Sequence, residues 1–240
     1  MYKEVLDKEG YFILRDVLTK EEIEEYKNLT VDYIKNNRQI CHAKGITIPN
    51  FMNRPHFAKL SELVNNKNIH VMLKDVFGEN YRFCGHNDIG INRIAGWHKD
   101  KLNPPYGKYE TVDIWEEKDG EKHEIIKVLI YLQDHSNDND GLKVVPWSQH
   151  KKTYETDNYV QLKPKLGDAI VFDQRITHRG MEKQVLRPRI LVSLGFGKNN
   201  IFTDNFEKGT NARQNEQNKR KKFRLEEGQF KPFNKIFLDK

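Results

Sequence analysis

The sequence has few cysteines and no long apolar run. Two cysteines, Cys41 and Cys84, occur among 240 residues without a CxxC spacing, so a disulfide between them would be an accident of the fold, and two free thiols in a reducing cytoplasm are expected. No segment approaches the ~18–20 consecutive apolar residues of a membrane span. The first residues include acids and no apolar core before small residues, so we do not expect a signal peptide. These features predict a cytoplasmic protein.

The sequence has an excess of positive charge, which is concentrated near its end. Residues 201–240 hold ten basic and six acidic residues and therefore carry +4 of the net +6. The run at 218–224, NKRKKFR, could bind an anionic polymer. However, acids follow it at once and no aromatic residues are interleaved with it, so a solvated surface stretch is favoured. Nucleic acid is an unlikely partner, and the oligomeric state is left open.

The length and composition fit one domain. At 240 residues with 37% hydrophobic and 11% aromatic residues, the chain can build a single core but is short for two. We expect one domain over residues 1–200 and a basic C-terminal extension over residues 201–240.

Two helical patterns stand in the first third of the chain. A short apolar run at 10–18 predicts a strand, and the helix after it begins at a capping box formed by Thr19 and Glu22. A second helix is predicted at 68–78, where apolar residues recur at helical spacing and Gly78 ends the pattern.

From about residue 80 the apolar pattern alternates with a period of two, which predicts strands. Because turn residues and no helical patterns separate them, an antiparallel sandwich or barrel is expected. We therefore predict an α+β fold that is mostly β, a double-stranded β-helix (jelly-roll or cupin-like barrel) with N-terminal helices packed on one sheet. The segment 100–123, with two adjacent prolines and many charges, is expected to form a lid. The predicted strands are 81–94, 124–134, 141–147, 159–164, 168–175 and 189–197.

The motif Trp97-His98-Lys99-Asp100 is the main chemical signal. In an extended segment residues i and i+2 point to the same side, so one imidazole and one carboxylate would face a common point. These are two of the three ligands of the 2-His-1-carboxylate facial triad of non-haem iron. His178, just after the strand at 168–175, can supply the third ligand. A lone HxD is common by chance, and a second one, His86-Asn87-Asp88, competes with it.

Five segments in order resemble the phytanoyl-CoA dioxygenase family of Fe(II)/2-oxoglutarate-dependent oxygenases. They cover about residues 9–197. The family segment NGxLxxxPGSH is altered in this chain: Asp140 and Trp147 stand at the two Gly positions, and Gln149 is inserted before the His. The segments are EGYFILRDVLTKEEIEEYKNL, WHKD, DNDGLKVVPWSQH, LGDAIVFDQRITHRG and RPRILVSLGFG.

The resemblance implies iron at His98, Asp100 and His178. It also implies an arginine about ten positions after the second His that binds the distal carboxylate of 2-oxoglutarate. Arg189 and Arg187 are both candidates, and Arg189 is favoured because Pro188 makes residue 187 a turn position. A guanidinium suits this role because it makes two parallel hydrogen bonds to a carboxylate.

Other residues are weaker candidates. Lys127 could bind the same carboxylate or could simply face outward on a half-exposed strand. Ser193 would share the face of Arg189 on its strand. Possible substrate contacts are His86, Asp88, Asn92, Trp97 and Arg175.

The sequence thus predicts an enzyme that uses Fe(II), 2-oxoglutarate and O2 to hydroxylate or otherwise oxidise an unactivated C–H bond of a small molecule, with release of succinate and CO2. Two alternatives remain: a cupin-like metal enzyme that does not use 2-oxoglutarate, and a non-catalytic barrel that acts as a basic binding module.

Overall fold

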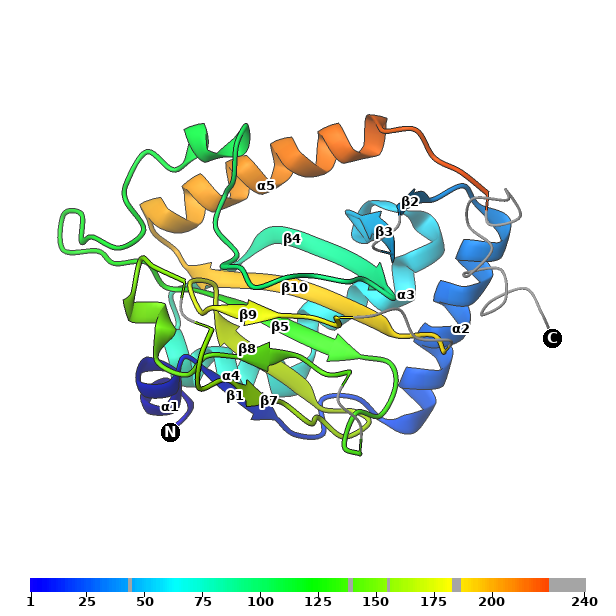
Figure 1. The fold of residues 1–240 in the computed structure, drawn as a ribbon, viewed down its shortest axis with the longest axis horizontal. Coiled ribbons are helices and arrows are strands. Elements are labelled where there is room, and N and C mark those ends of the chain that lie inside the picture. The colour runs from blue at the N-terminus through cyan, green and yellow to red at the C-terminus, as the bar shows by residue number, and fades with distance from the viewer. Residues whose placement is uncertain (43–44, 138–139, 155, 183–186, 225–240) are drawn as a thin grey trace.

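A computed structural model describes residues 1–42, 45–137, 140–154, 156–182 and 187–224. Two β-sheets lie face to face, with helices on the outer face of the larger one (Figure 1). Within the described residues, no helix is both long and apolar enough to cross a membrane.

The larger sheet has seven strands in the order β1-β8-β5-β10-β4-β3-β2. Every pairing in it is antiparallel. Its strands are β1 (Tyr11–Leu14), β2 (Ile40–His42), β3 (Gly45–Pro49), β4 (Tyr81–Ile91), β5 (Ile125–Tyr131), β8 (Ala169–Asp173) and β10 (Ile190–Lys198).

The smaller sheet consists of β7 (Val160–Gln161), β6 (Lys143–Val144) and β9 (His178–Arg179), in that order. In the described residues the two sheets are hydrogen-bonded separately, so they form two layers of a jelly-roll and not a closed barrel. The predicted α+β fold, mostly of antiparallel strands with helices on one sheet, is confirmed.

Helices α1 (Tyr2–Glu9), α2 (Lys20–Asn36), α3 (Ala58–Ser61) and α4 (Lys67–Phe77) cover the larger sheet. The predicted capping box is present: Thr19 Oγ1 accepts from the Glu22 amide at 3.2 Å, and a Glu22 oxygen accepts from the Thr19 amide at 2.8 Å. Such a cap typically stabilises a helix by about 1 kcal/mol. It fixes where α2 begins after β1.

Strand β5 shows how alternation creates two different environments. Ile126, Val128 and Ile130 pack with the helices in the main core. The intervening Leu129 and Tyr131 belong to the core between the sheets. Because every residue of β5 is buried, side chains on its second face must pack or line a cavity. A functional pocket can therefore form between the sheets.

Several elements were not predicted from the sequence. α1, β2 and β3 are short, and β9 is only two residues long, so each has too few residues for a periodic pattern. The predicted strands at 141–147 and 159–164 shorten to β6 and β7, since the residues that flank each pair mostly have irregular backbone.

Helix α5 (Ile201–Lys219) follows β10 directly and runs along β4 (Figure 1). It begins at Asn200, whose side chain accepts from the Thr203 amide at 3.2 Å. The sequence analysis places the end of the domain at residue 200 and an extension after it. In the structure the first 19 residues of that extension form α5, which packs on the larger sheet.

The segment predicted as a lid contacts α5. It contains the short helix η4 (Tyr106–Tyr109), and the Tyr106 hydroxyl donates to Glu216 at 2.6 Å. Leu102 packs with Phe206 in a small apolar cluster. This segment and α5 therefore form one wall above the larger sheet.

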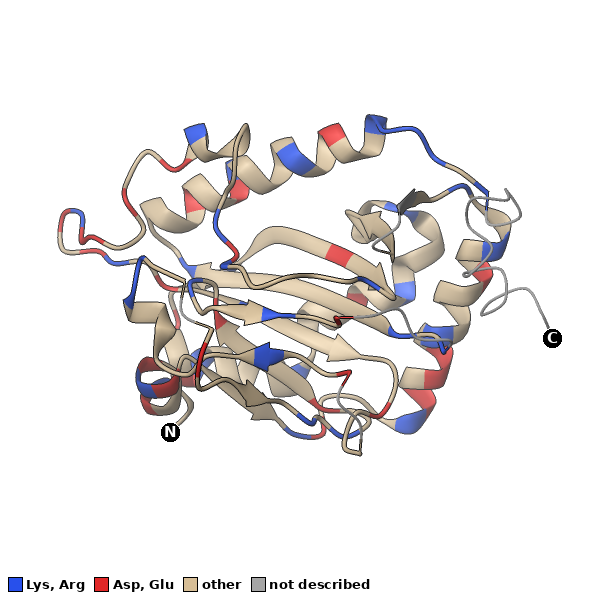
Figure 2. Cartoon of the chain, viewed as in Figure 1, with Lys and Arg blue, Asp and Glu red and all other residues tan. Residues whose placement is uncertain are grey.

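Basic residues gather where α5 ends, as Figure 2 shows. They include Lys219, Arg220, Lys221 and Lys222. Phe223 pairs with Gln39 through two backbone hydrogen bonds of 2.8 Å. The part of the run 218–224 after the helix is thus held against β2.

Candidate metal centre

His98 and Asp100 lie in the segment after β4, and their side chains point to the same side. Lys99 between them points the other way, where its Nζ donates to the carbonyl oxygens of Ser148 and Arg175 at 2.7 and 2.8 Å. The Asp100 amide donates to the Gln174 carbonyl at 3.0 Å. The HxD segment is therefore fixed in the extended form that its spacing predicts.

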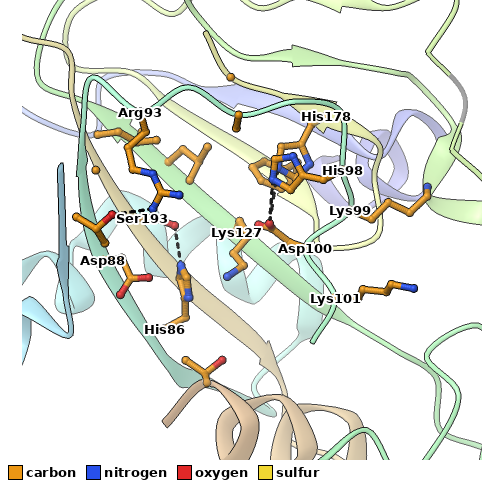
Figure 3. A pocket seen from close by; sticks show the side chains of 18 of the residues that line it. His86, Asp88, Arg93, His98, Lys99, Asp100, Lys101, Lys127, His178 and Ser193 are labelled. Carbon is orange, nitrogen blue, oxygen red and sulfur yellow. Dashed lines mark hydrogen bonds and ion pairs between the residues drawn. The ribbon is translucent and has the colours of Figure 1, made fainter. Parts of the chain in front are cut away.

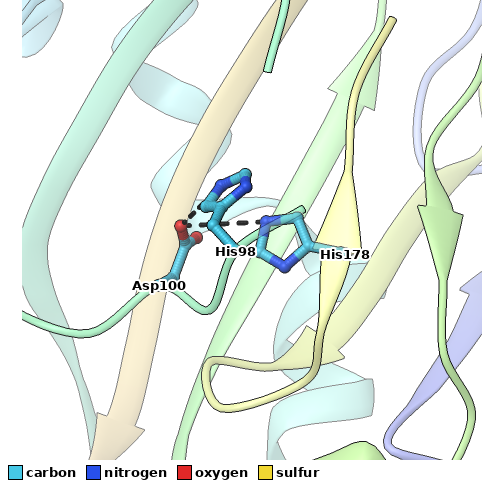
Figure 4. Close-up of side chains that lie close together, drawn as sticks. All are labelled: His98, Asp100 and His178. Atoms are coloured by element: carbon cyan, nitrogen blue, oxygen red, sulfur yellow. Dashed lines mark ion pairs between the residues drawn. The ribbon is translucent and has the colours of Figure 1, made fainter. Parts of the chain in front are cut away.

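His178 is brought to His98 by a reciprocal pair of backbone hydrogen bonds. Each amide donates to the carbonyl oxygen of the other residue at 2.9 Å. The centroids of the two rings are 4.2 Å apart. The ligand atoms of His98, Asp100 and His178 all lie within 4.8 Å of one another (Figure 4).

Both imidazole rings are oriented by the backbone. Nδ1 of His98 lies 2.7 Å from the Gly96 carbonyl oxygen, and Nδ1 of His178 lies 3.1 Å from that of Ile176. An Nδ1–H donating to a carbonyl leaves Nε2 unprotonated and able to bind a metal. Each Nε2 faces the Asp100 carboxylate, at 3.5 Å and 3.8 Å respectively.

The charge states of His178 and Asp100 suit metal binding, whereas the Asp100 carboxylate outweighs burial and raises the pKa of His98, whose proton a metal ion would displace. Burial, with a further contribution from His98, lowers the pKa of His178 to about 4. Burial alone would raise the pKa of Asp100, but the nearby His178 and His98 hold it well below its usual value. Near neutral pH the cluster therefore offers a neutral imidazole and an ionised carboxylate, which are the forms that bind cations.

A cavity of about 450 Å³ adjoins the cluster. This volume lies in the lower part of the range for small-molecule sites. Figure 3 shows side chains of the HxD segment, β4, β5 and β10 directed into it. Apolar walls come from Leu102, Leu129, Phe172, Leu191 and Phe206.

Arg189 lines this cavity and is only 3% exposed. Its Nη2 donates to the Tyr131 hydroxyl and its Nε to the Asp140 carbonyl oxygen, both at 2.7 Å. Nη1 has no hydrogen-bond partner in the described part of the chain. Arg187 instead pairs with the Asp140 carboxylate at 2.8 Å and is half exposed. Of the two candidates, Arg189 alone reaches the cavity.

Lys127 and Ser193 also line the cavity. Lys127 is 2% exposed, which excludes the outward-facing interpretation of this residue. The hydroxyl oxygen of Ser193 lies 3.0 Å from Nε2 of His86.

The competing H-x-D pair belongs to a different cluster. Arg213 of α5 donates to His86 Nδ1 at 3.1 Å and to Asp88 at 2.9 Å. Gln214 donates to Asp88 at 3.1 Å. Burial and the nearby Lys127 lower the pKa of His86 to about 3. His86 and Asp88 thus border the cavity, but in the described residues they join no metal-binding cluster.

Three candidate substrate residues lie outside the cavity lining. The Asn92 side chain bonds the backbone of Arg187 and Arg189. Trp97 packs against Tyr159. Arg175 pairs with Asp173 at 2.8 Å. Asn92 is fully buried because it holds the start of β10 in place.

The cavity residues that sequence reasoning missed include Arg93, Tyr131, Phe206 and Arg213. Tyr131 could have been found, since it shares a strand face with Lys127 at i+4. Phe206 and Arg213 carry no local signal, because only the packing of α5 brings them to the cavity.

Comparison with known proteins gives one family match. Residues 86–195 match the model of the 2OG-Fe(II) oxygenase superfamily. This segment contains His98, Asp100, His178 and Arg189. No curated protein sequence matched the chain.

Several solved structures share the fold. The 2-oxoglutarate (alpha-ketoglutarate)-dependent epimerase SnoN from nogalamycin biosynthesis is 13% identical, with a TM-score of 0.61 and 82% of both chains covered. HygX from Streptomyces hygroscopicus, with nickel and 2-oxoglutarate bound, is 15% identical with a TM-score of 0.60, covering 81% of this chain and 85% of that one. The non-haem monooxygenase ThoJ, as a nickel complex, is 13% identical with a TM-score of 0.63, covering 82% and 77%.

At these identities the structural matches establish the fold, and the family model adds the sequence pattern. The cofactors predicted from the sequence, Fe(II), 2-oxoglutarate and O2, agree with that model and with the clustered His98, Asp100 and His178. Residues 86–195 therefore resemble the 2OG-Fe(II) oxygenase superfamily in sequence pattern, and the chain shares its fold with solved structures of such enzymes.

Proposed function

We propose that the protein is an Fe(II)- and 2-oxoglutarate-dependent dioxygenase that hydroxylates, or otherwise oxidises, an unactivated C–H bond of a small molecule, releasing succinate and CO2. The observation that carries this proposal is the cluster of His98, Asp100 and His178 beside a cavity that also contains Arg189. The phytanoyl-CoA dioxygenase-like subfamily is the narrower assignment that we propose from the five resembling segments.

The three clustered side chains fit iron. Two neutral imidazoles and one carboxylate are the donor set of the facial triad, which leaves further positions for co-substrate and O2. Both rings present Nε2, and both are held through Nδ1 by backbone carbonyl oxygens. Partners of this kind orient ligands and raise metal affinity.

Arg189 fits the distal carboxylate of 2-oxoglutarate. Its guanidinium is buried and fixed by Tyr131, so little side-chain entropy would be lost on binding. Nη1 still lacks a partner within the described residues, and a carboxylate would provide one. A cupin-like enzyme without 2-oxoglutarate would have no use for this group.

When bound, iron and 2-oxoglutarate supply the oxidising power for the reaction with O2 and the C–H bond. The contribution of the chain is positioning and exclusion of water. Leu102, just after the HxD segment, and Phe206 of α5 form an apolar wall. Two hydrogen bonds with Gln174 hold the backbone of Asp100. The Asp100 amide donates to the Gln174 carbonyl oxygen, and the Gln174 side-chain amide donates to the Asp100 carbonyl oxygen.

The proposal is tested by anaerobic titration of the purified protein with Fe(II) and 2-oxoglutarate. A 2-oxo acid that chelates Fe(II) gives a weak visible charge-transfer band. We expect this band in the wild type, its loss in His98→Ala, and a requirement for at least tenfold more 2-oxoglutarate in Arg189→Met.

The matched control is Arg187→Met, which removes the half-exposed neighbouring arginine and should leave the 2-oxoglutarate requirement unchanged. Iron binding without a band in the wild type would rule out 2-oxoglutarate and favour the cupin-like alternative. Equal effects of the two arginine variants would show that Arg189 does not bind the distal carboxylate of 2-oxoglutarate.

A further inference from the structure

Lys127 is a buried cation without a counter-ion. It is 2% exposed, and its Nζ has no hydrogen bond and no carboxylate at ion-pair distance in the described part of the chain. Nζ lies over the ring of Phe206, whose centroid is 4.8 Å away. Burying an unpaired ammonium is costly unless another group compensates. The side chain lines the cavity, so a bound molecule can provide that compensation.

Arg93 is a second cation that lines the cavity. Its Nη1 donates to the Thr47 hydroxyl at 2.8 Å, and no described carboxylate pairs with it. Figure 3 shows Arg93 directed toward Ser193, and Lys127 directed toward His86. Arg213, the third cation here, is already neutralised by Asp88 at 2.9 Å.

Charge balance separates these two cations from the cofactors. Iron(II), the Asp100 carboxylate, doubly charged 2-oxoglutarate and Arg189 together sum to zero. Lys127 and Arg93 then remain, with a charge of two that no cofactor balances. A substrate with an anionic group would balance it and would be fixed in orientation beside the metal.

Strand register places Lys127 away from Arg189. Lys127 of β5 pairs with Gly195 of β10, which is six residues along the chain from Arg189. With a rise of about 3.3 Å per residue, the two backbone positions are roughly 20 Å apart. Arg189 is bonded to Tyr131, which lies four residues along β5 from Lys127, so the two side chains enter the cavity from separate positions on the sheet.

We propose that the substrate is a small molecule with an anionic group, a carboxylate or a phosphate, that binds Lys127, with Arg93 adding positive charge to the same cavity, and an apolar body that packs on Leu102 and Phe206. This inference rests on the proposed function, because it assigns Arg189 to 2-oxoglutarate. It places Lys127 on the substrate side of the site, in contrast to the cofactor role considered from the sequence.

The test uses three probes that share a phenyl group: phenylacetate, phenyl phosphate and uncharged 2-phenylethanol. Their dissociation constants are measured by calorimetry on the anaerobic Fe(II) protein with saturating 2-oxoglutarate, while the visible band shows that 2-oxoglutarate stays bound. The variants are Lys127→Met, which keeps the length of the side chain, and Lys74→Met, which removes an exposed charge on α4.

We expect at least one acid to bind the wild type at least tenfold more tightly than 2-phenylethanol. This preference should disappear in Lys127→Met and persist in Lys74→Met. The acid that binds more tightly identifies the anionic group as a carboxylate or a phosphate.

Equal binding of acids and alcohol by the wild type would overturn the inference, as would an unchanged preference in Lys127→Met. Loss of the 2-oxoglutarate band in Lys127→Met would show that Lys127 binds 2-oxoglutarate and not the substrate, which would also overturn the inference. Absence of the band in the wild type would instead refute the proposed function, so the two failures are distinguishable.

Discussion

His98 and His178 donate their backbone amides to each other's carbonyl oxygens, both at 2.9 Å. This exchange joins two segments that are 80 positions apart in the sequence. Because the contact is made by the backbone, the two rings are held together before any metal binds. The cluster is therefore preorganised, which lowers the cost of ordering ligands on metal binding.

Removing any one residue of the cluster should abolish tight metal binding. We expect His98→Ala, Asp100→Ala and His178→Ala each to weaken Fe(II) or Co(II) affinity by about 100-fold or more, since even partners of ligands contribute about 10–100-fold. The affinity is measured by competition with a metal-binding dye. His150→Ala, which removes an exposed histidine, is the control. Tight binding that survives in a cluster variant would contradict the assignment.

Arg213→Met should destabilise the protein through Asp88. The Asp88 side chain is 13% exposed and would lose its charged partner while keeping weaker donors. Leaving one member of a buried ion pair unpaired costs about 3–5 kcal/mol, and the remaining bonds from Gln214 and Asn50 place the expected loss near the lower limit. The free energy of unfolding is measured in urea.

The control for this prediction is Arg220→Met, since the Arg220 pair with Glu216 is half exposed. Such pairs contribute about 0–1 kcal/mol. The double variant Arg213→Met/Asp88→Asn should recover part of the stability, because no unpaired charge stays buried. Similar losses for the two single arginine variants would contradict this account of how α5 is held.

Lys127→Met should make the metal-free protein more stable. Burial lowers the pKa of Lys127, which means that its charged form is disfavoured in the folded state. Replacing a buried charge by an apolar side chain of similar length removes that cost, and we expect a gain of about 1–2 kcal/mol. Thermal unfolding measures the change. A less stable variant would mean that the ammonium is part of the structural framework and not held for a ligand.

His123 should make stability depend on pH in the acid range. It is 2% exposed, and burial together with Arg175 lowers its pKa from 6.5 to about 4. The unfolded chain therefore binds a proton at His123 in a pH range where the folded protein does not. Stability from this residue is present above pH 6.5 and is lost as the pH falls toward about 4.

The measurement compares wild type and His123→Gln, which still bonds to Gln174 but does not titrate. Between pH 7 and pH 4.5 we expect the wild type to lose about 2–3 kcal/mol more than the variant. His150→Gln, at an exposed position, should follow the wild type. A parallel decline in all three proteins would show that His123 is not the source.

Much of the fold could be predicted because its signals are local. The capping box of Thr19 and Glu22 fixes the start of α2, and alternation along β4, β5 and β10 fixes which residues share a face. The two-residue strand β9 could not be predicted, since its pairing with β6 depends on tertiary contacts. Helix α5 has apolar residues at too few positions to indicate that it would pack on β4.

The sequence by itself determined the HxD pattern, the second histidine after a buried strand, and the arginine that follows. These depend on spacing within one strand or loop, which local backbone geometry sets. Only the tertiary structure decided that Arg189, not Arg187, reaches the cavity, and that His86 and Asp88 pair with Arg213. It also decided that Lys127 is buried with no carboxylate at ion-pair distance among the described residues. Those outcomes depend on which distant elements pack together, and that is a property of the whole core.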